Sequence, residues 1–217
     1  MLRLDKVSVS YKDTLALKNI TIHIQEGQKV ALIGPSGAGK TTLLYTLYEL
    51  EKQHASFVYQ DYALVPQLSV FHNVYMGRLD HYHTAYNLFN LLKPQKKEIE
   101  KVAPILDSLG MLDTMFKRVG ALSGGQQQRA AIARAMFRKV ETMFADEPVS
   151  SIDPHQAGTV LRLITHATKT VIFSLHSVDL ALQFAERIIG MRLGQILFDL
   201  PSDQVNDHVL SQLYKPC

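Results

Sequence analysis

The chain has 217 residues, of which 47% are apolar and 20% charged, and its formal net charge at pH 7 is +3. This balance is typical of a globular protein, and the length predicts one large domain with a satellite. The charge is too small to indicate a nucleic-acid surface, and no apolar run approaches the roughly 20 residues that cross a bilayer. The single cysteine, Cys217, excludes a disulfide framework and a cysteine zinc cluster and fits a reducing cytosol. The first ten residues carry charges where a signal peptide needs an apolar stretch, so composition predicts a soluble protein.

The first sixty residues read mainly as strands. Alternating isoleucines predict a half-buried strand over 20–24, and a continuous apolar run predicts a strand covered on both faces over 29–33. A turn lies between them at 26–28. Leucines at helical spacing then predict a helix over 41–51, and a second short strand follows over 56–59. These elements place a glycine-rich loop between a buried strand and a helix.

The rest of the chain alternates helices with strands after a long polar and helical middle. In that middle, the apolar face around Ile99 and Val102 predicts a helix that ends near Gly110 and is kinked or broken at Pro104. Helices are then predicted over 126–139, over 155–167 and from 178, with strands over 142–145 and 171–175. This alternation predicts a parallel α/β sheet with right-handed crossovers.

The loop after the strand over 29–33 has the chemistry of a phosphate-binding loop. Residues 34–41 read GPSGAGKT and fit the pattern G-x-x-x-x-G-K-[ST] in full, with a strand before and a helix after. Glycines let backbone N–H groups turn toward phosphate oxygens, and the helix N-terminus adds positive charge. Lys40 supplies a charge to the β- and γ-phosphates, and Thr41 offers a hydroxyl to Mg²⁺. The loop predicts a nucleoside triphosphate site.

Polar residues follow three of the predicted strands at the point where each strand ends. Asp146 and Glu147 follow the strand over 142–145, His176 follows the next strand, and Gln60 follows the strand that ends at 59. Because ligands of open α/β sheets bind at the carboxyl ends of the strands, we expect these side chains beside the phosphate loop. Asp146 would hold Mg²⁺ and Glu147 would orient or deprotonate the attacking water. Gln60 and His176 would contact the γ-phosphate and that water.

A second glycine-containing motif, LSGGQ, occupies residues 122–126. Ser123 and Gln126 have the spacing of a capping box for the helix that follows. Capping alone does not require Gly124 and Gly125, which leave backbone N–H groups exposed at a positive helix end. The motif therefore predicts a second anion site.

With this motif, the chain resembles the ATP-binding subunit of ABC transporters over nearly its whole length. LSGGQ is that family's signature, GPSGAGKT matches Walker A, and TMFADEP resembles Walker B. FVYQ, which ends at Gln60, resembles the Q-loop, residues 150–153 the D-loop, and His176 the switch histidine. Tyr11 matches the aromatic residue that stacks on adenine. NVYMGRL, SLHSVDLA and IIGMRLGQILFD resemble most the phosphonate importer ATPases.

The resemblance implies a fold and a set of site residues. The fold is a P-loop NTPase with a RecA-like parallel sheet, a reduced antiparallel β-subdomain and an inserted helical subdomain. The whole chain, 1–217, is one ABC ATPase domain, with 1–60 and 136–217 as the catalytic core and 61–135 as the helical part that carries LSGGQ. Catalysis falls to Glu147, His176 and Gln60, and Mg²⁺ to Thr41, Gln60 and Asp146. The residues implied to bind ATP are Tyr11, Gly34, Pro35, Ser36, Gly37, Ala38, Gly39, Lys40, Thr41, Thr42, Ser123, Gly124, Gly125 and Gln126.

The chain departs from the family between Thr42 and Gln60, which only residues 43–59 separate. Family members place an extra β-hairpin in this stretch, so the sequence predicts a trimmed antiparallel subdomain with the chemistry intact. A smaller departure is Thr142, a polar residue where the strand is usually apolar. We expect it to cost packing without affecting the site.

The resemblance also implies partners, because in this family the two halves of an ATP site come from different chains. It predicts a head-to-tail homodimer with two ATP molecules, in which Lys40, Thr41 and Asp146 face Ser123 and Gly125 of the other chain. Residues 61–73 would form the groove for a permease, a solute-binding protein would take part indirectly, and no nucleic acid is expected. The subunit would lie peripherally on the cytoplasmic side of the cell membrane. Two alternatives remain, a soluble ABC-type ATPase acting on nucleic acid or ribosomes and a nucleotide-binding regulator without turnover.

Overall fold

The computed structural model describes residues 1–12 and 14–215, and Cys217 lies outside this range. The described part contains a six-stranded sheet in the order β4-β5-β6-β3-β7-β8 and a separate antiparallel pair, β1-β2. The strands of the large sheet are β3 (Lys29–Ile33), β4 (Ala55–Val58), β5 (Thr142–Asp146), β6 (Thr170–Ser174), β7 (Arg187–Arg192) and β8 (Gln195–Pro201). The first five strands in that order run parallel, and β8 is antiparallel to β7. The predicted parallel α/β sheet is thus confirmed, and it gains an antiparallel edge strand.

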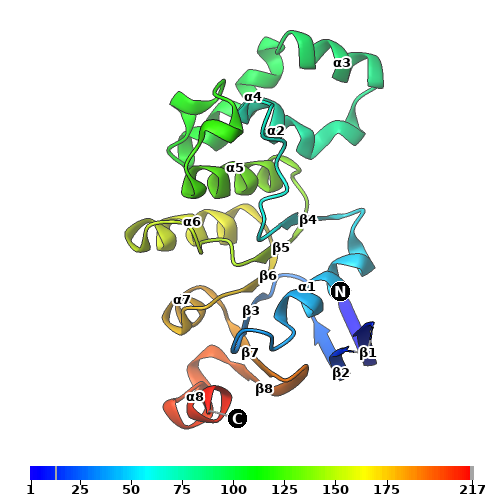
Figure 1. Ribbon diagram of the computed structural model, residues 1–217, viewed down its shortest axis with the longest axis vertical. Helices are drawn as coiled ribbons and strands as arrows, with labels where there is room; N and C mark the ends of the chain where they lie inside the picture. Colours follow the sequence, from blue (N-terminus) through cyan, green and yellow to red (C-terminus); the bar gives the residue numbers. More distant parts are fainter. Residues whose placement is uncertain (13, 216–217) are drawn as a thin grey trace.

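The strands in the middle of this sheet are covered on both faces, which explains their continuous apolar sequences. Alternate residues of β5 and β6 belong to two different cores. Ala145 and Phe173 pack into one core, whereas Phe144 and Ile172 pack into the other. The helices that cover the sheet are α1 (Lys40–Glu51) in the second core, and α5 (Gly124–Phe137), α6 (Pro154–Ala167) and α7 (Val178–Phe184) in the first. Figure 1 shows these helices on opposite sides of the strands.

The antiparallel part of the fold is small. It consists of β1 (Leu2–Tyr11) and β2 (Thr14–Ile24), which pair along their length. Between the end of α1 at Glu51 and the start of β4 at Ala55 there is only a short turn, and the described residues place no strand there. The prediction of a reduced antiparallel subdomain is therefore confirmed, and the reduction lies in the connection from α1 to β4.

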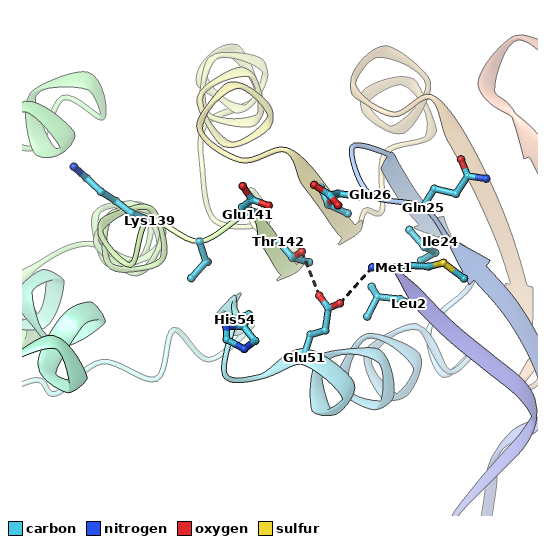
Figure 2. Close-up of a pocket in the computed structure, with 12 residues that line it drawn as sticks. Met1, Leu2, Ile24, Gln25, Glu26, Glu51, His54, Lys139, Glu141 and Thr142 are labelled. Carbon is cyan, nitrogen blue, oxygen red and sulfur yellow. Dashed lines mark hydrogen bonds and ion pairs between the residues drawn. The ribbon is translucent and has the colours of Figure 1, made fainter.

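The end of α1, just before this short connection, provides a partner for Thr142. The Oγ1 atom of Thr142 donates a hydrogen bond to Glu51 Oε2 at 3.4 Å, and Glu51 pairs with the Met1 amino group at 3.4 Å (Figure 2). The hydroxyl of Thr142, a polar group in an otherwise apolar strand, thus has a hydrogen-bond acceptor. These side chains line a hollow of about 440 Å³ at the edge of the sheet where β5 and β6 begin, opposite the edge that carries the strand-end polar residues.

The middle of the chain forms a mostly helical part at one end of the molecule, and the C-terminal helix lies at the other end (Figure 1). The remaining helices are α2 (Val70–Tyr75), α3 (Thr84–Leu92), α4 (Lys96–Ser108) and α8 (Asp207–Tyr214), with 3₁₀ helices η1 (Met76–His81), η2 (Leu112–Thr114), η3 (Val119–Ala121) and η4 (Ser202–Gln204). No described helix is both long enough and apolar enough to span a bilayer.

Helix α4 differs from its prediction at one residue. The sequence predicts a kink or a break at Pro104, and the break is wrong because the helix runs through this residue. Val102 and Leu106 are fully buried on the inner face, and this packing outweighs the single backbone hydrogen bond that proline cannot make. The predicted stop at Gly110 is confirmed. Gly110 has φ of 63°, and the next N–H, that of Met111, donates to Leu106 O at 2.7 Å, which satisfies a carbonyl of the last turn.

Candidate active site

The phosphate loop connects β3 to α1 at the carboxyl edge of the sheet, as predicted. Gly34 has φ of 147°, and a Cβ atom there would lie 2.1 Å from Met191 O. Gly39, the residue before α1, has φ of 100°, and its Cβ would lie 2.9 Å from Ala16 O. Only glycine fits these two positions. Gly39 also provides no side-chain cap for α1, so the first N–H groups of the helix stay available to a ligand.

Lys40 lies folded into this loop. Its side chain is buried, and Nζ donates to Gly34 O at 2.8 Å and to Pro35 O at 3.1 Å. Burial lowers the pKa of Lys40, and the charges of Glu147 and Asp146 oppose that shift. The ammonium group is therefore held at the centre of the loop with two carboxylates nearby.

Asp146, at the end of β5, is held by hydroxyl groups from two neighbouring elements. Thr41 Oγ1 donates to Asp146 Oδ2 at 2.7 Å, and Ser174 Oγ donates to Asp146 Oδ1 at 2.5 Å. Asp146 is 2% exposed and Ser174 is fully buried. Thr41 and Asp146 thus present a hydroxyl and a carboxylate oxygen next to each other, the oxygen donors that hard cations prefer.

Glu147 joins the ends of three strands. His176 Nε2 lies 2.6 Å from Glu147 Oε1, and Gln60 Nε2 donates to Glu147 Oε2 at 3.4 Å. Each carboxylate oxygen therefore has its own partner. The expectation that these strand ends meet beside the phosphate loop is confirmed by these contacts and by the contact between Thr41 and Asp146.

A cleft of about 500 Å³ lies over the phosphate loop. Residues 36–42, Gln60 and Glu147 line it together with 14–16 and Lys18 of β2 and the turn at Leu193 and Gly194. Tyr11 is not part of that lining; it ends β1 and is 58% exposed. Residues 123–126 do not line the cleft either. Within the described chain, the signature motif and the phosphate loop do not form one cavity.

The signature motif begins α5 with the predicted capping box. Gln126 N donates to Ser123 Oγ at 3.3 Å, and Ser123 N donates to Gln126 Oε1 at 3.0 Å. Gly125 has a packing reason as well, because a Cβ atom there would lie 2.7 Å from Ser151 O. At Gly124 a Cβ would meet only ordinary contacts, the nearest being Tyr62 Oη at 3.7 Å. The start of α5 therefore packs on the segment that follows Glu147.

Some polar residues at this site are missing from the sequence prediction. Strand β6 is apolar between Thr170 at its start and Ser174 at its end. The polar residue at the end of an apolar strand could have identified Ser174 as a site residue. Gln128 and Arg134 lie on α5 among many polar residues, where nothing in the sequence distinguishes them. Arg134 donates to Tyr62 O at 2.8 Å and to Ala63 O at 2.5 Å, and so holds the segment after Gln60. Burial lowers the pKa of Arg134.

Comparisons with known proteins show which family the chain is similar to. Residues 17–150 match the family model described as ABC transporter. The phosphonates import ATP-binding protein PhnC 2 of Synechococcus sp. is 35% identical over 244 aligned residues, which cover 99% of this chain and 90% of that protein. A PhnC 3 protein of Halalkalibacterium halodurans is 36% identical, with 99% and 94% covered. Both alignments are longer than this chain, so these relatives have residues that it lacks.

Solved structures share the fold. A bacterial ABC transporter cassette, described as a dimer, superposes with a TM-score of 0.82 at 26% identity and covers 93% of this chain and 99% of its own. The same cassette in a post-hydrolysis state bound to ADP and Pi has the same score and identity. A nucleotide-free ATP-binding cassette superposes with a TM-score of 0.76 at 20% identity and shows the fold alone.

Proposed function

The chain belongs to the ABC transporter family as an ATP-hydrolysing subunit, and we propose that it energises the import of phosphonates or a similar oxyanion. The observation that carries this proposal is that Lys40, Asp146 and Glu147 lie close together at one edge of the sheet. The chain also aligns over nearly the whole length of relatives that are named as phosphonate import proteins. That naming does not favour the alternative of a soluble ATPase acting on nucleic acid or ribosomes.

In this proposal the loop residues bind the phosphates and Glu147 prepares the water. The backbone N–H groups of 36–42 and the ammonium of Lys40 contact the β- and γ-phosphates. Glu147 orients the attacking water and accepts its proton. His176 and Gln60, which contact separate oxygens of Glu147, keep that carboxylate directed at the cleft. Tyr11 stacks on the adenine from the end of β1.

Mg²⁺ fits the oxygens that this site presents. Thr41, Asp146 and the side-chain oxygen of Gln60 would hold it, and the 2.7 Å contact between Thr41 and Asp146 already brings two of these groups together. When bound, the ion would offset the negative charge that develops on the phosphates. Ser174 would keep the Asp146 carboxylate oriented toward Thr41.

We further propose a head-to-tail homodimer with two ATP molecules at its interface. Support comes from the separation of 123–126 from the cleft and from the related cassette that is described as a dimer. Ser123, Gly124, Gly125 and Gln126 of the partner subunit would close the cleft, where the γ-phosphate meets the positive end of α5. Loss of that phosphate on hydrolysis would open the dimer, so ATP would bias a two-state assembly.

The remaining partners follow from the proposed role. Permease subunits in the membrane would contact a groove at 61–73, and a solute-binding protein would deliver the cargo to them. The chain would therefore lie peripherally on the cytoplasmic side of the membrane.

Transport by the reconstituted complex tests the proposal. The chain is copurified with its membrane partner, placed in vesicles with ATP, and assayed for uptake of methylphosphonate, phosphate and sulfate. We expect ATP-dependent uptake that is highest for methylphosphonate. The matched control is Glu147→Gln, which should bind ATP and form the dimer yet transport nothing. Equal uptake of all three anions, or purification with nucleic acid and without a membrane protein, would contradict the proposal.

A further inference from the structure

Gln128 is a buried amide on α5 whose three side-chain contacts all go to one short segment. Its Nε2 donates to Glu147 O at 2.7 Å and to Ser150 Oγ at 3.4 Å, and its Oε1 accepts from Ser151 N at 2.8 Å. The residue is 1% exposed. Both ends of the amide are thus used, and both hold the segment that begins at Glu147.

The backbone at Glu147 needs such support. Its φ is 50°, a left-handed conformation that is unfavourable for a residue with a side chain. The N–H of Glu147 donates to Ser174 Oγ at 2.9 Å on one side. Its carbonyl accepts from Gln128 Nε2 on the other side, and from Ser150 N at 3.2 Å. The peptide groups that aim the Glu147 side chain are therefore held between β6 and α5.

The same helix holds the segment after Gln60. Arg134 donates to the carbonyls of Tyr62 and Ala63, which also have positive φ values of 64° and 46°. Tyr62 Oη in turn lies 2.7 Å from Ser151 Oγ. Helix α5 therefore holds both the backbone of Glu147 and the segment that follows Gln60, which is one of the two contacts of the Glu147 carboxylate.

We propose that Gln128 is a positioning residue for ATP hydrolysis, which sets the direction of the Glu147 carboxylate by holding that residue's backbone carbonyl. Gln128 lies little more than one helical turn from Ser123, which the capping box fixes to α5. A shift of the signature end of α5 therefore moves the Gln128 amide, and with it the Glu147 peptide. The proposal rests on the proposed role of Glu147 in activating water.

Two substitutions separate positioning from simple stability. Gln128→Glu has nearly the same shape, and its ionised carboxylate still accepts from Ser151 N but cannot donate to Glu147 O. Gln128→Leu removes all three side-chain contacts. For each we expect kcat for ATP to fall about 10- to 100-fold, because small misplacements of a catalytic group have effects of that size. The KM and the affinity for ATP should stay within about twofold, because neither substitution touches the phosphate loop.

The pH profile gives a signature that a structural role would not produce. When protonated, the carboxyl of Gln128→Glu regains a donor toward Glu147 O. The ratio of its kcat to that of the parent should therefore rise as the pH falls into the range in which the new carboxyl takes up a proton. The same ratio for Gln128→Leu should not change with pH. If the leucine variant fails to fold, the pH dependence of the ratio for Gln128→Glu decides the question by itself.

Asn90→Leu is the matched control. Asn90 is a fully buried amide on α3 that accepts from Gln95 N at 2.8 Å. Its loss should lower the melting temperature and leave kcat per folded molecule unchanged. Parental kcat in Gln128→Glu at all pH values, or a joint loss of ATP affinity and kcat, would overturn the proposal. Parental hydrolysis by Glu147→Gln would instead overturn the proposed function, so the two failures are distinguishable.

Discussion

Two buried carboxylates, Asp146 at the sheet edge and Glu98 in the helical part, have opposite surroundings. Glu98 is 1% exposed and receives the Lys101 ammonium at 2.8 Å and 3.0 Å, together with the hydroxyls of Tyr82 at 2.9 Å and Tyr86 at 3.2 Å. Asp146 is 2% exposed and receives the hydroxyls of Thr41 and Ser174. The Lys101 ammonium thus contacts and neutralises the buried charge of Glu98. Asp146 instead accepts its hydrogen bonds from neutral hydroxyls, and Lys40 acts on it only as a nearby charge, so its carboxylate stays available to a bound cation. Two carboxylates with nearly equal burial therefore have different roles: Glu98 stabilises the fold, and Asp146 is available to stabilise a bound cation.

Asp146→Asn, which removes the carboxylate at the sheet edge, should have the largest effect on activity. The amide keeps the shape but removes the charge that a metal ion needs, so we expect kcat to fall at least about 100-fold. Stability without nucleotide should stay equal or increase, because a buried charge is removed. Steady-state hydrolysis measures the first effect, and thermal unfolding with and without ATP and Mg²⁺ measures the second. Full stabilisation of the variant by ATP and Mg²⁺ would contradict the assignment of Asp146.

Ser174→Ala tests the same region with an intermediate effect. The hydroxyl donates to Asp146 and accepts from Glu147 N, so its loss leaves two buried polar groups with one partner fewer. We expect a loss of about 1–3 kcal/mol in the free energy of unfolding and a fall of about tenfold in kcat. Denaturant titration and steady-state hydrolysis check the two numbers separately. A variant with reduced stability and parental kcat would show that Ser174 supports the fold alone.

Most of the sheet-edge residues could be predicted because their function requires particular residue types at short, fixed spacings in the sequence. A phosphate loop needs glycines and a lysine at fixed spacing, and carboxylates at the end of an apolar strand can reach it only at one edge of the sheet. Contacts such as those of Gln128 with Glu147 and of Arg134 with Tyr62 join residues far apart in the chain. Their side chains look like ordinary polar positions of a helix, so no pattern marks them.

The failed break at Pro104 has a related cause. Local rules assign a proline in a helix to an interruption, yet the burial of Val102 and Leu106 depends on tertiary packing that the local rule does not contain. The partner of Thr142 was also unpredictable, because Glu51 reaches it through the short connection between α1 and β4. The sequence therefore predicts elements and motifs better than the contacts that join them.

Glu98→Gln, which removes the buried carboxylate of the helical part, should have the smallest effect on activity. Burial alone would raise the pKa of Glu98, but hydrogen bonds from Lys101, Tyr82 and Tyr86 and the charge of Lys101 outweigh it and leave that pKa below its usual value of 4.5. A carboxyl whose pKa is lowered by folding stabilises the protein above the unfolded pKa, and that contribution is lost as the pH falls through the folded pKa. The substitution should therefore cost about 1–3 kcal/mol at neutral pH, with kcat per folded molecule unchanged.

Because acid removes the same charge from the parent, the difference in the free energy of unfolding between parent and Glu98→Gln should shrink as the pH falls below about 4.5. Denaturant titrations at a series of pH values measure it. Lys96→Gln is the control, since the pair of Lys96 with Glu100 on the same helix is exposed and spans 3.9 Å, so its removal should change little at physiological salt. If the stability difference for Glu98→Gln stays constant down to pH 3, Glu98 and its partners stabilise the protein through packing rather than through charge. The two carboxylates would then not differ in how their charges are used.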